Sequence, residues 1–439
     1  MKGVFTNIFT LLLAGCSSTP SVERLLETQE GELKTGGSTT MLFHSSLYYP
    51  SEISLSFPGY IVGIEKSPVH TISSGEQVKS KEHPNSGFDE TKLLEDPKIM
   101  YVSHIIETYG KPYGEGNCAL YNAYYRENNK TPKPPTEYCP DVEKLEVPPK
   151  DAFNSSWKAM DVLSRRINTN ISNYTHVIVL TMGWNTVQEE AVRNFNSIGK
   201  NLKFAANDEE FKPLFIGVTW PSQWMSDWLE PVIKIASFPI KAKDADEVGL
   251  TWLGVLLHET LADITIPVVV IGHSFGARAT SVATCLGPAI ANPNPETKTK
   301  NKVINYLINL QAAYRSSRLI PPHKEGKLRY YDGCKNAENI ILTSSINDKA
   351  MDTLFWRKDY YMGDDKGYDK YCGEEQKKLN CGIAKPDGHY ELINKTTSNI
   401  TYINSDKLIN KNSYLSGGDA HSDIYREEHG VLLWDILSK

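Results

Sequence analysis

A serine in the Gly-His-Ser-Phe-Gly stretch at residues 272–276 has a setting that suggests covalent chemistry. An apolar, β-branched run, 268–271, precedes it and is typical of a strand buried on both faces. A helix-compatible segment, 277–286, follows. Strand, tight turn and helix in this order form a nucleophile elbow, which lifts the serine hydroxyl above the sheet edge beside the free N–H groups of the helix start. The spacing predicts that Ser274 is a nucleophile; the alternative is a glycine-rich turn in a parallel-sheet protein.

A serine hydroxyl needs a base to accept its proton and an acid to orient that base. Asp348 follows the predicted strand 340–344 at its carboxyl end, the edge where sites of parallel sheets assemble. Asp352, one helical turn further on, is the alternative acid, and either carboxylate could instead cap a helix. His421 lies in a small-residue loop, 417–423, just before the last predicted helix. We expect His421 to be the base; the alternative is a solvated loop histidine.

Two other histidines follow Asp348 in the chain. His389 lies in a Pro-Asp-Gly-His turn, well before the last predicted strand. His429 lies within or beside the last predicted helix, where we expect it at the surface. His421 therefore stays the preferred base.

The negative charge that develops in acyl transfer needs two hydrogen-bond donors aimed at it. The N–H of Phe275, directly after the nucleophile, should supply one. The loop after the predicted strand 176–181 should supply the other through the N–H of Trp184, because Gly183 lets the backbone turn there. This predicts an oxyanion hole; the alternative is a simple strand-to-helix turn capped by Thr186.

Alternating strand and helix patterns from about residue 151 onward predict an α/β fold with a mostly parallel central sheet flanked by helices. We expect strands at 176–181, 214–219, 267–271, 303–310, 339–344 and 400–403, and helices at 152–171, 186–202, 243–263 and 424–437. Residues 39–72 contain two candidate strands, 40–43 and 60–64, and residues 99–150 are rich in Tyr, Pro and Gly. We expect 39–150 to be an irregular N-terminal region packed on the main domain, residues 151–439.

The first residues resemble a targeting segment and not part of the fold. Lys2 and a short apolar run lead to Leu-Ala-Gly-Cys at residues 13–16, which looks like a bacterial lipobox. The apolar run is too short for a transmembrane helix. We therefore expect a signal peptide over 1–15, lipid on Cys16 and a Ser- and Gly-rich tether over 16–38; the alternative is an ordinary secretory signal. Serines follow the cysteine where aspartate often marks inner-membrane retention, which favours a cell-envelope protein held at the outer membrane.

Composition and charge limit the classes of function. The chain has 439 residues, of which 40% are hydrophobic and 23% charged, with a net charge of -6. These values are typical of a globular protein and give no basic patch for nucleic acid, so we expect no nucleic-acid partner.

Six cysteines remain if Cys16 carries lipid, and an even number in an exported protein permits disulfides. Cys118 with Cys139, and Cys372 with Cys381, are the local candidates. We expect Cys285, on the helix after the elbow, to be a buried thiol. None has the paired spacing of a zinc site.

Several stretches resemble α/β-hydrolases, in particular the bacterial family of unknown function called DUF900. They lie at residues 181–185, 218–222, 272–278 and 420–424, so the resemblance covers about residues 170–435. It implies an α/β-hydrolase fold and a serine hydrolase of esterase or lipase type, without metal or cofactor. Met182 departs from the pattern, because many members have histidine there. The backbone donors remain, but the loop must be held in another way.

Three tryptophans after the strand 214–219, Trp220, Trp224 and Trp228, could wall an apolar acyl pocket; the alternative is core packing. Two hypotheses follow from the whole pattern. The first is a lipid-anchored serine hydrolase that cleaves small-molecule or lipid esters, including a lipase or phospholipase that acts on its own membrane. The second is a non-catalytic envelope lipoprotein that binds a partner through residues 39–150. Nothing in the pattern indicates an oligomeric state.

Overall fold

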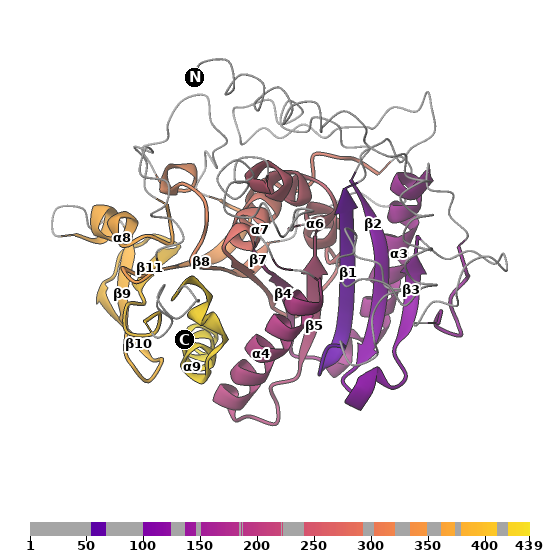
Figure 1. The fold of residues 1–439 in the computed structure, drawn as a ribbon, viewed down its shortest axis with the longest axis horizontal. Coiled ribbons are helices and arrows are strands. Elements are labelled where there is room, and N and C mark those ends of the chain that lie inside the picture. The colour runs from indigo at the N-terminus through magenta and orange to yellow at the C-terminus, as the bar shows by residue number, and fades with distance from the viewer. Residues whose placement is uncertain are drawn as a thin grey trace, which may run out of the picture.

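A single mixed sheet organises the chain in the computed structural model. The structure describes residues 54–66, 100–123, 137–145, 151–183, 186, 188–220, 222, 241–292, 303–320, 334–348, 361–373, 379–410 and 420–439. In this part, eleven strands lie in the order β10-β9-β11-β8-β7-β6-β4-β5-β1-β2-β3. The sheet runs across the molecule from β9 and β10 on the left to β2 and β3 on the right (Figure 1).

The strands are β1 (Pro58–Lys66), β2 (Met100–Tyr109), β3 (Cys118–Asn122), β4 (His176–Thr181), β5 (Pro213–Thr219), β6 (Val268–His273), β7 (Ile304–Leu310), β8 (Ala337–Ser344), β9 (Asn380–Ala384), β10 (Tyr390–Asn394) and β11 (Ile400–Asn404). The eight from β1 through β5, β4, β6, β7, β8 and β11 to β9 pair in parallel. Antiparallel pairs β1–β2, β2–β3 and β9–β10 complete the two edges. The predicted α/β class with a mostly parallel sheet is therefore confirmed.

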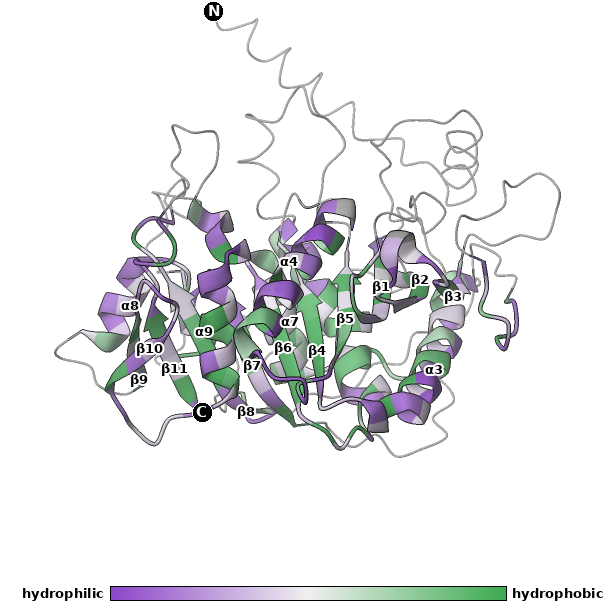
Figure 2. Cartoon of the chain, turned by 90° about the horizontal axis from the view of Figure 1, so that it is seen from below, coloured by the Kyte–Doolittle hydropathy of each residue, from purple (hydrophilic) through white to green (hydrophobic). Residues whose placement is uncertain are grey.

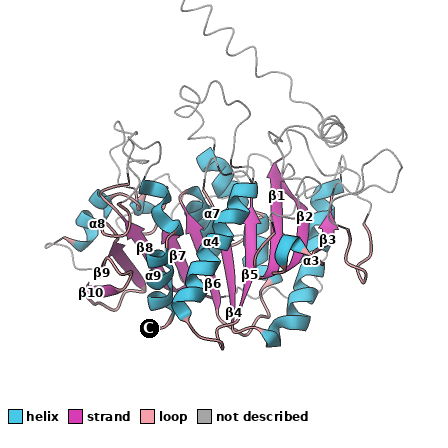
Figure 3. Cartoon of the chain, turned by 60° about the horizontal axis from the view of Figure 1, so that its bottom comes forward, coloured by secondary structure: helices cyan, strands magenta, loops and turns pink. Residues whose placement is uncertain are grey.

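Helices cover both faces of the sheet. They are α3 (Ala152–Asn170), α4 (Gln188–Ala206), α6 (Trp252–Val255), α7 (Phe275–Leu286), α8 (Asp365–Cys372) and α9 (Glu427–Leu437), with residues 241–250 also helical. A π-helical turn, Leu256–Thr260, follows α6. Residues of α3, α6 and α7 pack in one core, and residues of α4 and α9 pack in the other. α4 and α9 lie side by side on their face (Figure 3).

The central strands have apolar side chains at both alternating positions, which explains the two cores. In β4, Val177 and Val179 belong to one core while Ile178 and Leu180 belong to the other. Successive strand residues point to opposite faces, so a continuous apolar run requires cover on both sides. Figure 2 shows the hydrophobic residues gathered on the central strands and on the sides of the helices that face them.

Part of the N-terminal region belongs to the sheet. Residues 39–150 were expected to be irregular, but β1, β2 and β3 form three of its strands. β1 includes the candidate strand 60–64 and pairs in parallel with β5, while the candidate strand 40–43 lies outside the described residues. β2 escapes sequence patterning because polar Ser103, His104 and Glu107 interrupt its apolar run, although all three are buried.

Two strands near the C-terminus, β9 and β10, were also not expected. Both are five residues long and mix polar with apolar residues, and the turn around His389 joins them. Their stability comes from pairing with β11 and with each other, which local propensity does not express.

Three disulfides link the six cysteines in the described part of the chain. The expected pairs Cys118–Cys139 and Cys372–Cys381 are present. The expectation of a free thiol at Cys285 is wrong, because it pairs with Cys334, 49 residues away. A pair so far apart in sequence is brought together by the fold, since Cys285 ends α7 while Cys334 precedes β8.

His429 is buried, contrary to the expected surface position. Its exposed fraction is 1%, and neither ring nitrogen has a hydrogen-bond partner. Burial lowers the pKa of His429 to about 4, with the neighbouring Arg426 acting in the same direction. The neutral ring of His429 therefore packs as an apolar group on the buried side of α9.

We expect this histidine to make the fold sensitive to acid. The pKa is depressed in the folded state, so the unfolded chain takes up a proton first as the pH falls below about 6.5. The resulting loss accumulates down to the folded value of about 4 and amounts to about 3 kcal/mol. Urea unfolding at pH 7.5 and pH 4.5 should show a smaller acid loss for His429→Leu than for the parent. Phe204→Leu, at an exposed site without a titratable group, should keep the parent's pH dependence; equal losses in all three proteins would contradict the assignment.

Within the described residues, no helix is both long enough and apolar enough to cross a membrane. The predicted signal peptide, Cys16 and the tether lie outside this part of the chain.

Candidate active site

Ser274 occupies a strained turn between β6 and α7. Its backbone angles are φ 57° and ψ −122°, a region that non-glycine residues rarely adopt. The neighbouring strand holds this conformation, because the Ser274 N–H donates to the Leu310 carbonyl at 3.1 Å and the Ser274 carbonyl accepts from the Ala313 N–H at 3.1 Å. The residue after β6 is thus fixed as the N-cap of α7, which is the geometry expected of a nucleophile elbow.

Two glycines make this turn possible. A Cβ on Gly276 would lie 2.2 Å from the Thr181 carbonyl oxygen, and a Cβ on Gly272 would lie 2.5 Å from Cα of Ala277. Neither position has space for a side chain, because backbone approaches backbone there. The Gly-x-Ser-x-Gly spacing therefore has a steric cause at both of its glycines.

His421 and Asp348 come together although 73 residues separate them. Nδ1 of His421 lies 2.7 Å from Oδ2 of Asp348, whose side chain is completely buried, while the His421 side chain is 13% exposed. A carboxylate accepts from Nδ1–H and so favours the tautomer with its basic nitrogen at Nε2. The structure thus brings together the two residues that were predicted as base and acid. The alternative acid, Asp352, lies outside the described residues.

The turn that carries His421 lies against the elbow. This turn is a 3-10 helix, Ala420–Tyr425. His273, the residue before Ser274, has its Nε2 2.9 Å from the His421 carbonyl oxygen, and the two imidazole rings are 4.6 Å apart between centroids. The nucleophile, base and acid candidates thus gather at the carboxyl edge of β6 and β8.

One segment after β11, residues 405–410, supports both the acid and the base. The Asn347 side chain donates to the Ile409 carbonyl at 2.9 Å, next to Asp348. On the other side, the Asn410 N–H donates to Asp423 at 2.8 Å, and Arg426 binds both Asp423 and the Leu408 carbonyl. Sequence patterns did not indicate this support, because it joins loops that are far apart in the chain.

The predicted oxyanion loop lies directly on the nucleophile. A Cβ on Gly183 would lie 2.5 Å from Cβ and 3.0 Å from Oγ of Ser274. Phe275 begins α7, directly after Ser274. Trp184, the proposed second donor, lies outside the described residues. The structure therefore places the start of the loop and the Phe275 backbone beside Ser274.

Two aromatic side chains hold this loop through Met182, the residue that stands where many DUF900 members have histidine. Trp220 donates from Nε1 to the Met182 carbonyl at 2.8 Å, and the Tyr425 hydroxyl lies 3.6 Å from the Met182 sulfur. Trp220 is 3% exposed and packs in the core, so it does not wall an open acyl pocket. Trp224 and Trp228 lie outside the described residues.

Arg278, four residues after the nucleophile, anchors α7. Arg278 and Arg318 each donate two hydrogen bonds to the buried carboxylate of Asp246, at 2.6 to 2.9 Å. Burial opposes the charge of Asp246, but the two guanidinium groups hold its pKa well below the usual range. This cluster ties the helical residues 241–250 to the helix that carries the elbow. Arg278 lies in the stretch 272–278, but its partners became visible only in the fold.

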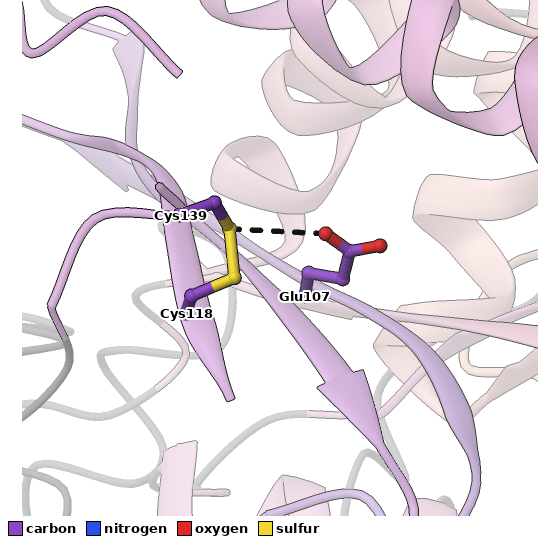
Figure 4. Close-up of side chains that lie close together, drawn as sticks. All are labelled: Glu107, Cys118 and Cys139. Atoms are coloured by element: carbon purple, nitrogen blue, oxygen red, sulfur yellow. Dashed lines mark hydrogen bonds between the residues drawn. A yellow bond between two sulfur atoms is a disulfide. The ribbon is translucent and has the colours of Figure 1, made fainter. Parts of the chain in front are cut away.

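A second cluster of acid and sulfur groups lies away from the elbow. Ligand-type atoms of Glu107, Cys118 and Cys139 lie within 4.8 Å of one another, the one such group found in the described chain. Figure 4 shows the two sulfurs bonded to each other, with Glu107 beside them. The S–S distance is 2.01 Å. A cysteine binds a metal ion as a thiolate, so this disulfide-bonded pair offers no sulfur ligand. Arg166 pairs with Glu107 at 3.1 Å.

Glycine at position 183 should be essential for the proposed chemistry. We expect Gly183→Ala to lower kcat by about 10²- to 10³-fold, because the added Cβ displaces the loop that carries an oxyanion donor. Gly382→Ala on β9 provides the control. Its Cβ would also approach a carbonyl oxygen, that of Glu391 at 3.1 Å, but β9 lies several strands away from the elbow strand β6. Ester hydrolysis and thermal unfolding should be measured on both. Parent-like kcat in a folded Gly183→Ala protein would argue against this oxyanion loop.

In comparisons with known proteins, no family model, curated protein or solved structure matches the chain. The resemblance to DUF900 therefore stays a prediction from the motifs. The fold and the site define the chain as an α/β protein with a Ser, His and Asp constellation at the carboxyl edge of its parallel strands.

Proposed function

We propose that this protein is a serine hydrolase of α/β-hydrolase type that cleaves carboxylic esters through an acyl-enzyme. The observation that carries the proposal is the His421–Asp348 pair, whose side chains are 2.7 Å apart. A hydrogen bond from His273, the residue before the strained Ser274, holds the main chain of His421 next to the elbow. Strained backbone and a buried acid–base pair at one sheet edge are costly features that catalysis explains.

The proposed reaction has two halves. Ser274 Oγ attacks the ester carbonyl carbon, and its proton passes to Nε2 of His421. Asp348 stabilises the imidazolium, while the N–H groups of Phe275 and Trp184 hold the oxyanion. Collapse breaks the C–O bond, and the leaving alcohol takes the proton from His421. Water then loses a proton to His421 and attacks the acyl carbon. The bond between that carbon and Ser274 Oγ breaks, Oγ takes the proton back from His421, and the acid is released.

The topology supports the hydrolase fold in particular. The candidate nucleophile follows β6 in the middle of the parallel strands, the acid follows β8, and the base follows β11. This gives the chain order Ser, Asp, His that is typical of α/β-hydrolases. Fold alone does not define activity, so the proposal depends on the site.

We propose further that the enzyme acts at the bacterial cell envelope, anchored by lipid on Cys16 and held at the outer membrane. The lipobox pattern at residues 13–16 supports this location, and three disulfides are typical of proteins exported from the cytoplasm. Small-molecule or lipid esters are the proposed substrates.

A fluorophosphonate probe tests the activity without altering the chain. We expect the folded protein to take up one probe per chain and heat-denatured protein to take up none, because the reaction needs an assembled base and oxyanion site. Peptide mass analysis should locate the probe on Ser274, and nitrophenyl esters of increasing acyl length should then define the preferred chain. A folded protein that neither reacts nor hydrolyses any ester would favour the non-catalytic alternative.

A further inference from the structure

His273 is a buried histidine that the proposed reaction does not use. It ends β6, immediately before Ser274, and its ring lies 4.6 Å from the ring of His421 and 6.3 Å from that of Tyr425. Its Nε2 is 2.9 Å from the main-chain carbonyl oxygen of His421. The residue before the nucleophile therefore contacts the backbone of the residue that would activate it.

The partner atom determines the direction of this hydrogen bond. A carbonyl oxygen only accepts, so Nε2 of His273 must carry the proton and donate. Burial lowers the pKa of His273 well below its usual value, and the positive charge that His421 acquires when protonated acts in the same sense. His273 thus stays a neutral donor while His421 changes charge, and it adds no second cation beside the imidazolium.

The other contacts of the Ala420–Tyr425 turn differ from the hydrogen bond between His273 and His421 in what they hold in place. Asp423 and Arg426 fix the later part of the Ala420–Tyr425 turn to residues 405–410. Asp348 holds the ring of His421 through Nδ1. His273 joins the main chain of His421 to the elbow, so it relates the position of the base to that of the nucleophile.

We propose that His273 is a positioning residue, whose Nε2–H holds the His421 main chain so that the His421 imidazole faces Ser274. This inference rests on the proposed hydrolase function. Its expected effect lies in kcat and not in KM, because a displaced base slows proton transfer without removing a substrate contact.

The test compares His273→Leu, which removes the donor, with His273→Gln, which keeps an N–H donor near the Nε2 position. We expect kcat about 10- to 100-fold lower for His273→Leu, with KM within about twofold. His273→Gln should restore kcat to within about threefold of the parent. His258→Leu is the matched control, because buried His258 also has Nε2 at 2.8 Å from a carbonyl oxygen, that of Ala283, at the far end of α7. That variant should lose stability but keep its kcat.

A spectroscopic readout separates this inference from the proposed function. The proton between His421 Nδ1 and Asp348 should give a far-downfield NMR resonance, which His273→Leu should shift or broaden and His273→Gln should preserve. An unchanged resonance and kcat in folded His273→Leu would overturn the proposal, as would a folded His273→Gln as deficient as His273→Leu. If the parent protein hydrolyses no ester, the proposed function fails, and the resonance alone still decides whether His273 positions His421.

Discussion

Ser274→Ala should abolish esterase activity, with kcat lower by about 10⁶-fold. The reason is that no acyl-enzyme can form without the hydroxyl. His421 and Asp348 then have no nucleophile to activate. Fluorophosphonate uptake should disappear with it. The measurement is steady-state hydrolysis of the best ester from the chain-length series, with active-site titration by the probe.

Ser281→Ala is the matched control for that experiment. Ser281 lies on the same helix, α7, and its buried hydroxyl binds Asn309 and Tyr314 instead of facing the sheet edge. We expect this variant to be less stable but to react with the probe normally. Probe uptake that survives in Ser274→Ala would mean that another residue is the nucleophile.

Asp348→Asn should lower kcat by about 10⁴-fold while leaving the fold intact. An asparagine amide can donate to Nδ1 of His421, which would stabilise the tautomer with its proton on Nε2 and remove the base that Ser274 needs. The neutral amide also cannot stabilise the imidazolium. The shape of the side chain is unchanged, so the buried site should still pack.

The pH dependence and the control for Asp348→Asn sharpen its interpretation. Activity of the variant should recover partly at high pH, where hydroxide can replace the missing base. Asp208→Asn, at an exposed position beyond α4, should behave like the parent in hydrolysis and unfolding. If Asp348→Asn retained more than about a tenth of the parent kcat, Asp348 would not be the orienting acid.

Local pattern determined the elements that carry the site. β4, β6 and β8 each contain an apolar run that needs burial on both faces, whereas polar residues interrupt β7 and β11. The predicted bounds of all five strands lie within two residues of those observed. The predicted start of α3, residue 152, is the observed one. The elbow also lies where it was predicted, and its Gly272 and Gly276 mark backbone contacts that exclude any side chain. The motif also placed Ser274, Asp348 and His421 after three different strands of one sheet, which the structure brings to one edge.

Elements without a strong pattern of their own became visible only through their partners. β2 contains buried polar residues, and β9 and β10 are short, so their pairing depends on neighbours distant in the chain. Cys285 and Cys334 meet because α7 ends beside the start of β8, a relation that spacing does not encode. His429 is likewise buried only in the folded chain, although its place in the sequence suggested the surface.

By itself, the sequence determined which residues could do chemistry and which strands would place them, because a glycine spacing and a run of apolar residues have local physical causes. Only the tertiary structure decided how those residues are held. The bond from His273 to His421, the two arginines on Asp246 and the Trp220 contact to Met182 join loops from separate strands. Such contacts depend on where the strand ends converge, and that follows from packing the whole sheet.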